Sequence, residues 1–324
     1  MKKYLVLVPL AIITALLNVY FGSVNISASE VTDLLLGKED VNEVTKYIIL
    51  QSRVPAAITS LLCGASLGVC GLLLQSFFRN PLAGPSILGI TSGANLAVAL
   101  AILCLGIVSP YSISLSAMVG AMAILAILLL LGKTVKDSTT LLIVGVLISF
   151  LTSAIITLIN YYTSADGAYS LIIWGMGTFN TVGTDNLALF SALSILGIIL
   201  AILLIKPLNG WMLGEYYAMN LGINIKRTRL LTLFTTGLLA SVATAFCGPI
   251  SFIGLSIPHI ARLITKTDNH RSLIPTSALL GAICTSLCLL ISTMPNEGRL
   301  LPINALTPIF GIPVILYILL RKNH

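Results

Sequence analysis

The sequence predicts an all-α membrane protein, a single domain over residues 1–324 that folds as a bundle of ten transmembrane helices. The first observation is composition: 57% of the 324 residues are hydrophobic and only 9% are charged, whereas about a quarter of the residues of a soluble domain are charged. The second is that the apolar residues form long runs, without the two-residue alternation of barrel strands. The third is that the charges are confined to short stretches between those runs.

A window of about 19 residues identifies the individual spans. They cover residues 4–22, 54–78, 87–108, 112–132, 139–161, 186–205, 230–246, 250–264, 272–293 and 303–320. We expect the first to be a retained helix rather than a signal peptide, because Gly22-Ser23-Val24 is a poor cleavage site. The eighth is too short for a crossing of ~20 residues and contains Pro258, which predicts a broken helix or one completed by buried loop backbone.

The distribution of charge orients these spans, because cytoplasmic segments are enriched in Lys and Arg. With the N-terminus inside, the inner segments hold fourteen basic and three acidic residues, and the outer segments hold four basic and eight acidic residues. We therefore predict cytoplasmic N- and C-termini, an acidic outer loop over 23–53 and a basic cytoplasmic loop over 206–229. The net charge of +7 thus has a membrane explanation, and we expect no nucleic-acid partner, because no basic patch lies on a polar surface.

The spans lack the groups that several membrane functions require. No Asp, Glu, Lys or Arg lies well inside any span, although ion-coupled carriers usually place ionisable groups there. Intramembrane hydrolases likewise need a metal, a carboxylate pair or a Ser/His couple. Gly132-Lys133-Thr134 looks like the end of a phosphate-binding loop, but the glycine that the motif needs five residues earlier is Ile127. These absences favour a transport subunit that borrows its energy from another chain.

Two segments at helix ends contain glycine followed by proline. Residues 75–90 link the second and third spans, and residues 247–262 lead into the eighth. Gly84-Pro85 is echoed by Gly248-Pro249 in a span of opposite direction, as expected from a 5+5 inverted repeat. The first segment is either an ordinary tight turn or a cytoplasmic gate, because non-helical backbone at membrane depth is tolerated where it is buried or faces water.

For the histidine and the glycines inside the spans we expect packing roles. A His on an apolar stretch is more often a hydrogen-bonded packing residue than a ligand, and His259 could stabilise a helix broken at Pro258. Gly64, Gly68 and Gly71 are predicted to lie where two helices pack closely, rather than against a substrate.

Seven motifs spread over nearly the whole chain carry a resemblance to a known family. They are Arg53-Val54-Pro55, the run from Gly64-Ala65-Ser66-Leu67 to Gln75, Arg79-Asn80-Pro81-Leu82-Ala83-Gly84-Pro85, Leu88-Gly89-Ile90-Thr91-Ser92-Gly93-Ala94, Trp174-Gly175-Met176-Gly177, Gly214-Glu215 to Leu221-Gly222, and Gly254-Leu255-Ser256-Ile257-Pro258-His259-Ile260-Ala261-Arg262. Together they resemble the FecCD-type permeases of bacterial ATP-binding-cassette (ABC) importers for iron-siderophores, haem and cobalamin.

The resemblance implies a type II importer-like permease, a multi-pass protein of the bacterial inner membrane. Two copies of the chain, as a homodimer, would surround the path, with two ATP-binding subunits that hold ATP and Mg²⁺ and a periplasmic or lipoprotein substrate-binding protein. The cargo would be a metal chelate, an iron-siderophore first and haem or cobalamin next. The chain itself would be no enzyme and would bind no cofactor or metal. An ion-coupled secondary transporter with inverted repeats is the alternative.

The resemblance also implies that residues 213–222 form short coupling helices that dock on the ATPase. The residues assigned to coupling are Gly214, Glu215, Ala218, Leu221 and Gly222. Gly222 would permit the sharp turn that follows. The basic residues after it, Lys226, Arg227 and Arg229, are interpreted as anchors at the membrane surface.

Two further sites are carried over from the family. The cytoplasmic gate maps to Asn80, Pro81 and Leu82 and to Ser138 and Thr139, and Ser138 is also a predicted helix N-cap.

Docking of the binding protein is assigned to Arg53 and Arg299, because Arg suits bidentate pairing with carboxylates. The family's Arg-x-Pro is usually followed by a second Arg, whereas this chain has Ala56 and Ala57. We therefore expect docking to depend on fewer charges.

Overall fold

The computed structural model describes residues 3–38, 42–107, 109–135, 138–294 and 300–322, and in these ranges it contains helices and no strand. The long helices are α1 (Tyr4–Tyr20), α4 (Val54–Phe78), α6 (Pro110–Thr134), α7 (Ser138–Tyr161), α9 (Thr184–Leu203), α12 (Ile225–Cys247), α14 (His270–Thr293) and α15 (Ile303–Lys322). The short ones are α2 (Ala28–Leu35), α3 (Glu43–Tyr47), α5 (Ile90–Ala99), α8 (Ala165–Gly175), α10 (Ile205–Met212), α11 (Glu215–Asn220) and α13 (Ile253–Thr265). A 3₁₀ turn (Pro85–Leu88) precedes α5, and π-helical turns (Ile48–Arg53, Leu100–Cys104) precede α4 and follow α5.

Each predicted span coincides with an apolar helix. By length and composition, six stretches of the described chain suffice to cross a membrane: Glu43–Phe78, Pro110–Thr134, Thr139–Tyr161, Thr184–Leu203, Ile225–Cys247 and His270–Thr293. Four shorter apolar helices match the other spans: Tyr4–Tyr20, Ile90–Cys104, Ile253–Thr265 and Ile303–Pro313. The all-helical class is confirmed, while the ten crossings, the cytoplasmic termini and the inverted repeat stay predictions.

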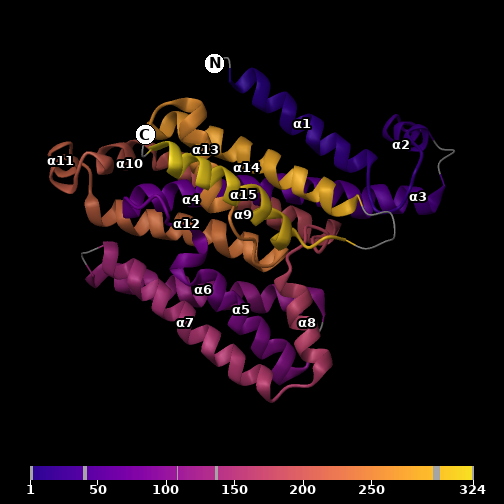
Figure 1. Cartoon of the computed structure of the whole chain (residues 1–324), viewed down its shortest axis with the longest axis horizontal. Helices are drawn as coiled ribbons and strands as arrows, with labels where there is room; N and C mark the ends of the chain where they lie inside the picture. The colour runs from indigo at the N-terminus through magenta and orange to yellow at the C-terminus, as the bar shows by residue number, and fades with distance from the viewer. Residues whose placement is uncertain (1–2, 39–41, 108, 136–137, 295–299, 323–324) are drawn as a thin grey trace.

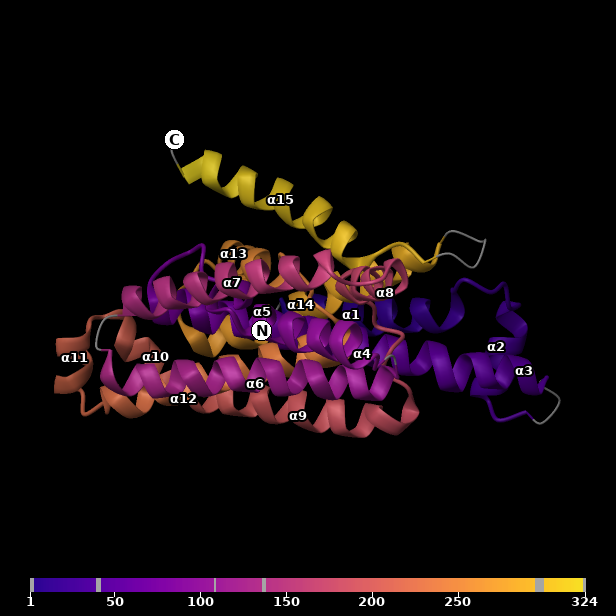
Figure 2. The same cartoon turned by 90° about the horizontal axis from the view of Figure 1, so that it is seen from below.

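The helices form an elongated bundle with two distinct ends. Helices α4, α12 and α14 run through its middle, and α5, α6, α7 and α8 gather beside them (Figure 1). Helix α15 lies over one face (Figure 2). Helices α10 and α11 stand at one end and α2 and α3 at the other, and both chain termini lie in the half that carries α10 and α11.

Close contacts at glycine hold the middle of the bundle together, as the sequence predicts. A Cβ atom added at Gly64 in α4 would lie 2.2 Å from the carbonyl oxygen of Gly281 in α14. One added at Gly71 would lie 1.7 Å from the carbonyl oxygen of Gly254 in α13. Because these are backbone atoms, only glycine permits the approach, and the packing interpretation of these glycines is confirmed.

The structure adds helices where the sequence suggested loop. The outer segment 23–53 contains α2, whose N-terminus has a capping box between Ser27 and Glu30, and α3, capped by Asn42. Helix α8 was not predicted at all. Helix α13 runs unbroken through Pro258, and non-helical backbone up to Phe252 precedes it, so the second of the two alternatives for this span is right.

Candidate functional site

The predicted coupling segment forms α11, a helix of six residues at one tip of the molecule. It lies between Gly214, with φ at 118°, and Gly222, with φ at 76°. Positive φ values favour glycine, so both turns depend on the residue type found there. Ala218 is buried against the bundle. The exposed large apolar side chains of the segment are Leu213, Tyr216, Tyr217, Met219 and Leu221.

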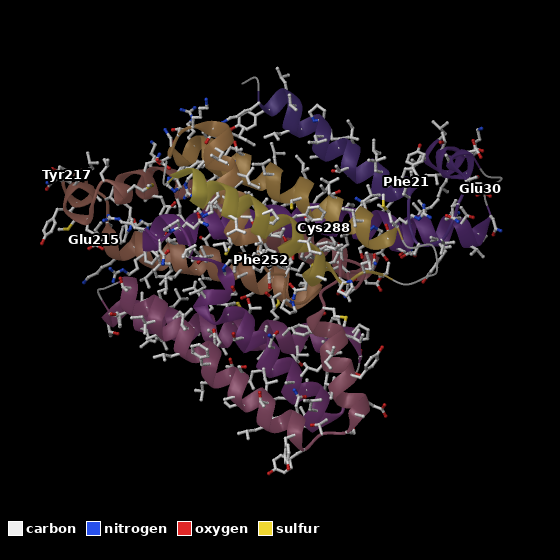
Figure 3. The ribbon with its side chains drawn as sticks, viewed as in Figure 1. Phe21, Glu30, Glu215, Tyr217, Phe252 and Cys288 are labelled. Atoms are coloured by element: carbon white, nitrogen blue, oxygen red, sulfur yellow. The ribbon has the colours of Figure 1, made fainter. Side chains whose placement is uncertain are left out.

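Glu215 and Tyr217 lie at the opposite end of the molecule from Phe21 and Glu30 (Figure 3). The predicted coupling segment and the acidic outer segment are therefore at opposite ends of the bundle. Opposite ends are what a transmembrane orientation with one segment on each side requires.

Helix α11 is joined to the bundle by Arg229 of α12. One guanidinium nitrogen lies 3.6 Å from a carboxylate oxygen of Glu215. Another donates to the carbonyl of Val135, just past the end of α6, at 2.6 Å. Only 8% of the Arg229 side chain is exposed. The interpretation of Arg229 as a surface anchor is therefore wrong, because the cation is used between helices, whereas Lys226 and Arg227 are exposed.

Helix α10, which leads into α11, contacts the end of α4 through Trp211. The indole stacks on Phe77, with ring centroids 5.3 Å apart, and its Nε1 donates to the carbonyl of Phe77 at 3.2 Å. Arg79 in turn donates to the carbonyl of Trp211 at 2.5 Å. A movement of α10 is thereby tied to the last turn of α4, which runs directly into the predicted gate.

A second contact between α10 and α4 passes through His270, a fully buried residue at the start of α14. Asn209 Oδ1 accepts from the backbone N–H of His270 at 2.9 Å and lies 2.7 Å from its Nδ1. On the other side of the ring, Nε2 lies 2.8 Å from the hydroxyl oxygen of Ser76 in α4. Since the amide oxygen can only accept, Nδ1 carries the proton and Nε2 accepts from Ser76.

The predicted gate segment follows α4 directly, after Arg79 in the left-handed conformation at φ 48°. Asn80 Oδ1 accepts from the backbone N–H of Leu82 at 2.9 Å, which fixes the turn. The carbonyl of Pro81 lies 2.9 Å from Nε2 of His259 in α13. His259 is thus hydrogen-bonded, as predicted, and one of its partners is the gate segment.

The other predicted half of the gate is the start of α7, which begins at Ser138 next to the exposed Thr139. Helix α7 packs on the segment after the first half: a Cβ added at Gly145 would lie 2.6 Å from the carbonyl oxygen of Ile87. Figure 1 places the start of α7 at the same end of the molecule as α10 and α11.

Arg53, predicted to dock a partner protein, is buried instead. Its guanidinium donates to the carbonyls of Val19 at 2.9 Å, Tyr20 at 2.8 Å and Val24 at 2.6 Å. These are acceptors at and beyond the end of α1, where helix carbonyls lack intrahelical partners. We therefore replace the docking prediction for Arg53 with a structural role, the tie between α1 and α4. Arg299 lies outside the described residues.

The sequence model of the FecCD transport family matches residues 10–321, nearly the whole chain. The chain belongs to the FecCD transport family. Similar proteins include the vitamin B12 import system permease proteins BtuC of Salmonella arizonae and Salmonella typhi, each 36% identical over 278 residues, 86% of this chain and 84% and 85% of theirs. A solved metal-chelate type ABC transporter in an inward-facing conformation is 30% identical, with a TM-score of 0.87 over 99% of both chains.

FecCD membership confirms the resemblance and makes the chain a multi-pass membrane permease. Sequence reasoning missed three residues of the site, namely Asn209, Trp211 and His270. Only Trp211 carries a signal, because it is one of two tryptophans and precedes the coupling segment by a few residues. Asn209 and His270 lie in helices that are distant in sequence, and nothing in the sequence indicates that they are in contact.

Proposed function

We propose that this chain is the permease subunit of an ABC importer that carries a metal chelate across the bacterial inner membrane. Two copies would form the path, two ATP-binding subunits would hold ATP and Mg²⁺, and a periplasmic or lipoprotein binding protein would deliver the cargo. The chain supplies the path and the mechanical link and needs no cofactor of its own. FecCD membership over residues 10–321 supports this assignment.

Cobalamin is the first cargo to test. The BtuC relatives import vitamin B12 by name, and the structural neighbour is a metal-chelate type transporter. These similarities do not favour the iron-siderophore that the sequence placed first. Iron-siderophores and haem therefore become the comparison substrates in the same uptake assay.

The proposed coupling of ATPase movement to the gate is supported by one observation. Helix α11 exposes apolar side chains at one tip of the molecule, and α10, which leads into it, contacts the end of α4. When ATP closes the ATPase pair, α11 would move with the subunit on which it docks. Arg229 would pass this movement to α12, and Trp211 and His270 would pass it to the last turn of α4. The gate segment 80–82 follows that turn, so a rigid-body shift of α10 would displace it.

The test is to purify the chain from its native membrane in mild detergent and identify the proteins that accompany it. We expect an ATPase whose hydrolysis rises with a binding protein, and uptake of cobalamin in vesicles that contain ATP. A chain that purifies alone and drives uptake from an ion gradient would overturn the proposal in favour of a secondary transporter.

Substitution of Gly222 tests the coupling assignment directly. Gly222→Val should abolish ATP-driven uptake, because a β-branched residue at positive φ costs about 1–2 kcal/mol and would redirect the turn after α11. Gly222→Asn should retain uptake, since Asn tolerates this conformation. Gly183→Val, at a φ of −73°, is the control. Equal uptake by the Gly222→Val and Gly222→Asn variants would remove the assignment.

Arg299→Glu tests the remaining docking residue. Reversal of this charge should weaken the affinity of the binding protein, and more so at low salt, because exposed charges are screened at higher ionic strength. Titration of labelled binding protein against the permease at two salt concentrations measures the effect. Equal affinity of the parent permease and the Arg299→Glu variant for the binding protein at low salt would contradict the role of Arg299.

A further inference from the structure

A groove of about 740 Å³ lies beside the turn that follows α11. It is lined by residues from the end of α9, the start of α10, the turn over 221–224 and the first half of α12. Its leucine and isoleucine lining residues are Leu200, Leu203, Leu204, Leu221, Ile223 and Leu231. Two bases, Lys206 and Arg227, also line it.

The groove has an apolar and a basic part. Leu203 and Leu231 are 69% and 39% exposed, and they belong to helices long and apolar enough to cross a membrane. Lys206 lies at the start of α10, just after α9, and Arg227 lies in the first turn of α12; both are exposed. A groove lined by leucines and by two cations suits the chemistry of a phospholipid, with acyl chains along the leucines and a phosphate at the bases.

No carboxylate within the described residues compensates the two bases. Neither Lys206 nor Arg227 belongs to any of the ion pairs found there. Glu215, the acidic residue of α11, pairs with Arg229 and lines a separate cavity on the other side of the turn. Asn224, which also lines the groove, uses its side-chain oxygen to accept from the backbone N–H of Arg227. The two cations are therefore available to an anion from outside the chain.

We propose that this groove binds an anionic phospholipid, whose phosphate lies between Lys206 and Arg227 and whose acyl chain packs on Leu203 and Leu231. The inner leaflet is its source, because the charge distribution of the sequence places this end of the bundle on the cytoplasmic side. A lipid suits the groove better than the ATPase does, since the leucine walls of the groove continue onto the outer surface of α9. The bound lipid would brace the turn between α11 and α12.

Binding is measured on the purified chain, without an ATPase, by native mass spectrometry and by thermal stability with dioctanoyl-phosphatidylglycerol. We expect phosphatidylglycerol to bind and stabilise, and dioctanoyl-phosphatidylcholine to do so at least tenfold more weakly. The double variant Lys206→Gln/Arg227→Gln should lose about 25-fold in affinity for phosphatidylglycerol, at roughly a factor of five per base. The matched control is Lys38→Gln/Lys46→Gln, two exposed bases at the opposite end, which should bind like the parent chain.

Three results would overturn the proposal. The first is equal affinity of the parent chain and the groove variant for phosphatidylglycerol. The second is stabilisation by inorganic phosphate as strong as that by the lipid, which would indicate a free-anion site without a role for the leucines. The third is unchanged lipid binding together with loss of ATPase association in the groove variant, which would assign the surface to the partner subunit. Because lipid binding is read on the isolated chain, its failure is distinguishable from failure of the transport assignment.

Discussion

The middle and the periphery of the bundle follow opposite rules of composition. In the most apolar stretches of Glu43–Phe78 and Ile225–Cys247, 83% of residues are buried, against 11% in Thr139–Tyr161. Yet the peripheral helix α7 is the most apolar of these three. A soluble protein shows the reverse, because it hides its apolar residues. Burial in this bundle is therefore not driven by hydrophobicity, since lipid tails are as apolar as leucine.

The middle is instead built from small residues and hydroxyl groups. Thr285 of α14 donates to the carbonyl of Ser60 in α4 at 2.7 Å, one turn from the Gly64–Gly281 approach. Asn18 of α1 donates to the carbonyl of Ser286 at 2.9 Å. Such groups let helices approach and hydrogen-bond across the interface, at the cost of lower hydropathy.

The largest loss of stability should come from a bulky side chain at a close helix–helix contact in the middle of the bundle. Gly71→Leu should destabilise by at least about 3 kcal/mol, because its Cβ alone would meet the carbonyl oxygen of Gly254 at 1.7 Å. The yield of monodisperse protein and its melting temperature measure the loss. Gly175→Leu in α8 is the control, since nothing lies within 4 Å of an added Cβ there. Similar yields of the two variants would contradict the close packing.

The same leucine truncation in the two regions tests the contrast itself. Leu73 in α4 is fully buried, whereas Leu147 in α7 is 59% exposed. Leu73→Ala should cost about 2–3 kcal/mol through the cavity that it leaves. Leu147→Ala should cost under about 1 kcal/mol, because lipid fills the space. Denaturation in mixed micelles compares the two, and equal costs would break the distinction between the middle and the periphery.

A smaller loss of stability should follow from removing a hydrogen-bonded side chain at the end of the middle helices near α10 and α11. His270→Leu should cost about 1–2 kcal/mol, since it removes the ring that contacts both Ser76 and Asn209 and leaves Oδ1 of Asn209 only the backbone N–H of residue 270. In a double-mutant cycle with Ser76→Ala, the two changes should be non-additive, because they remove the same hydrogen bond. A cycle with Ser60→Ala, which is distant along α4, should be additive. Additive costs for His270 and Ser76 would remove the proposed tie.

The smallest effect should come from an interhelical hydroxyl. Thr285→Val keeps the shape of the side chain and removes its bond to the carbonyl of Ser60. The expected cost is about 0.6 kcal/mol, a typical size for an interhelical hydrogen bond in a membrane bundle. Thr157→Val in α7 is the comparison, because that exposed hydroxyl donates to the carbonyl of Ser153 in its own helix. A cost above that of Leu73→Ala would show that polar contacts, rather than close approach, dominate the middle.

Much of the fold could be predicted from local sequence, and much of the site could not. Apolar run length located the helical segments, and family motifs located 213–222 and 80–82. Helix α8 escaped prediction because it is too short and mixed to stand out. The predictions for Arg53 and Arg229 are wrong for a common reason. An arginine next to a span is usually interpreted as a surface cation, whereas both side chains donate to backbone carbonyls at the ends of other helices.

Composition and run length by themselves determined the helical class, the positions of the apolar helices and the segregation of charge between the two ends. Those properties depend on the cost of placing charge and unpaired backbone in lipid, which is a local matter. Only the tertiary structure decided which helices are central, which arginines are buried, and that Asn209, Ser76 and His270 meet. These features depend on how closely helices distant in sequence approach each other. Backbone contacts at residues such as Gly71 set that approach, and they produce no periodic pattern in the sequence.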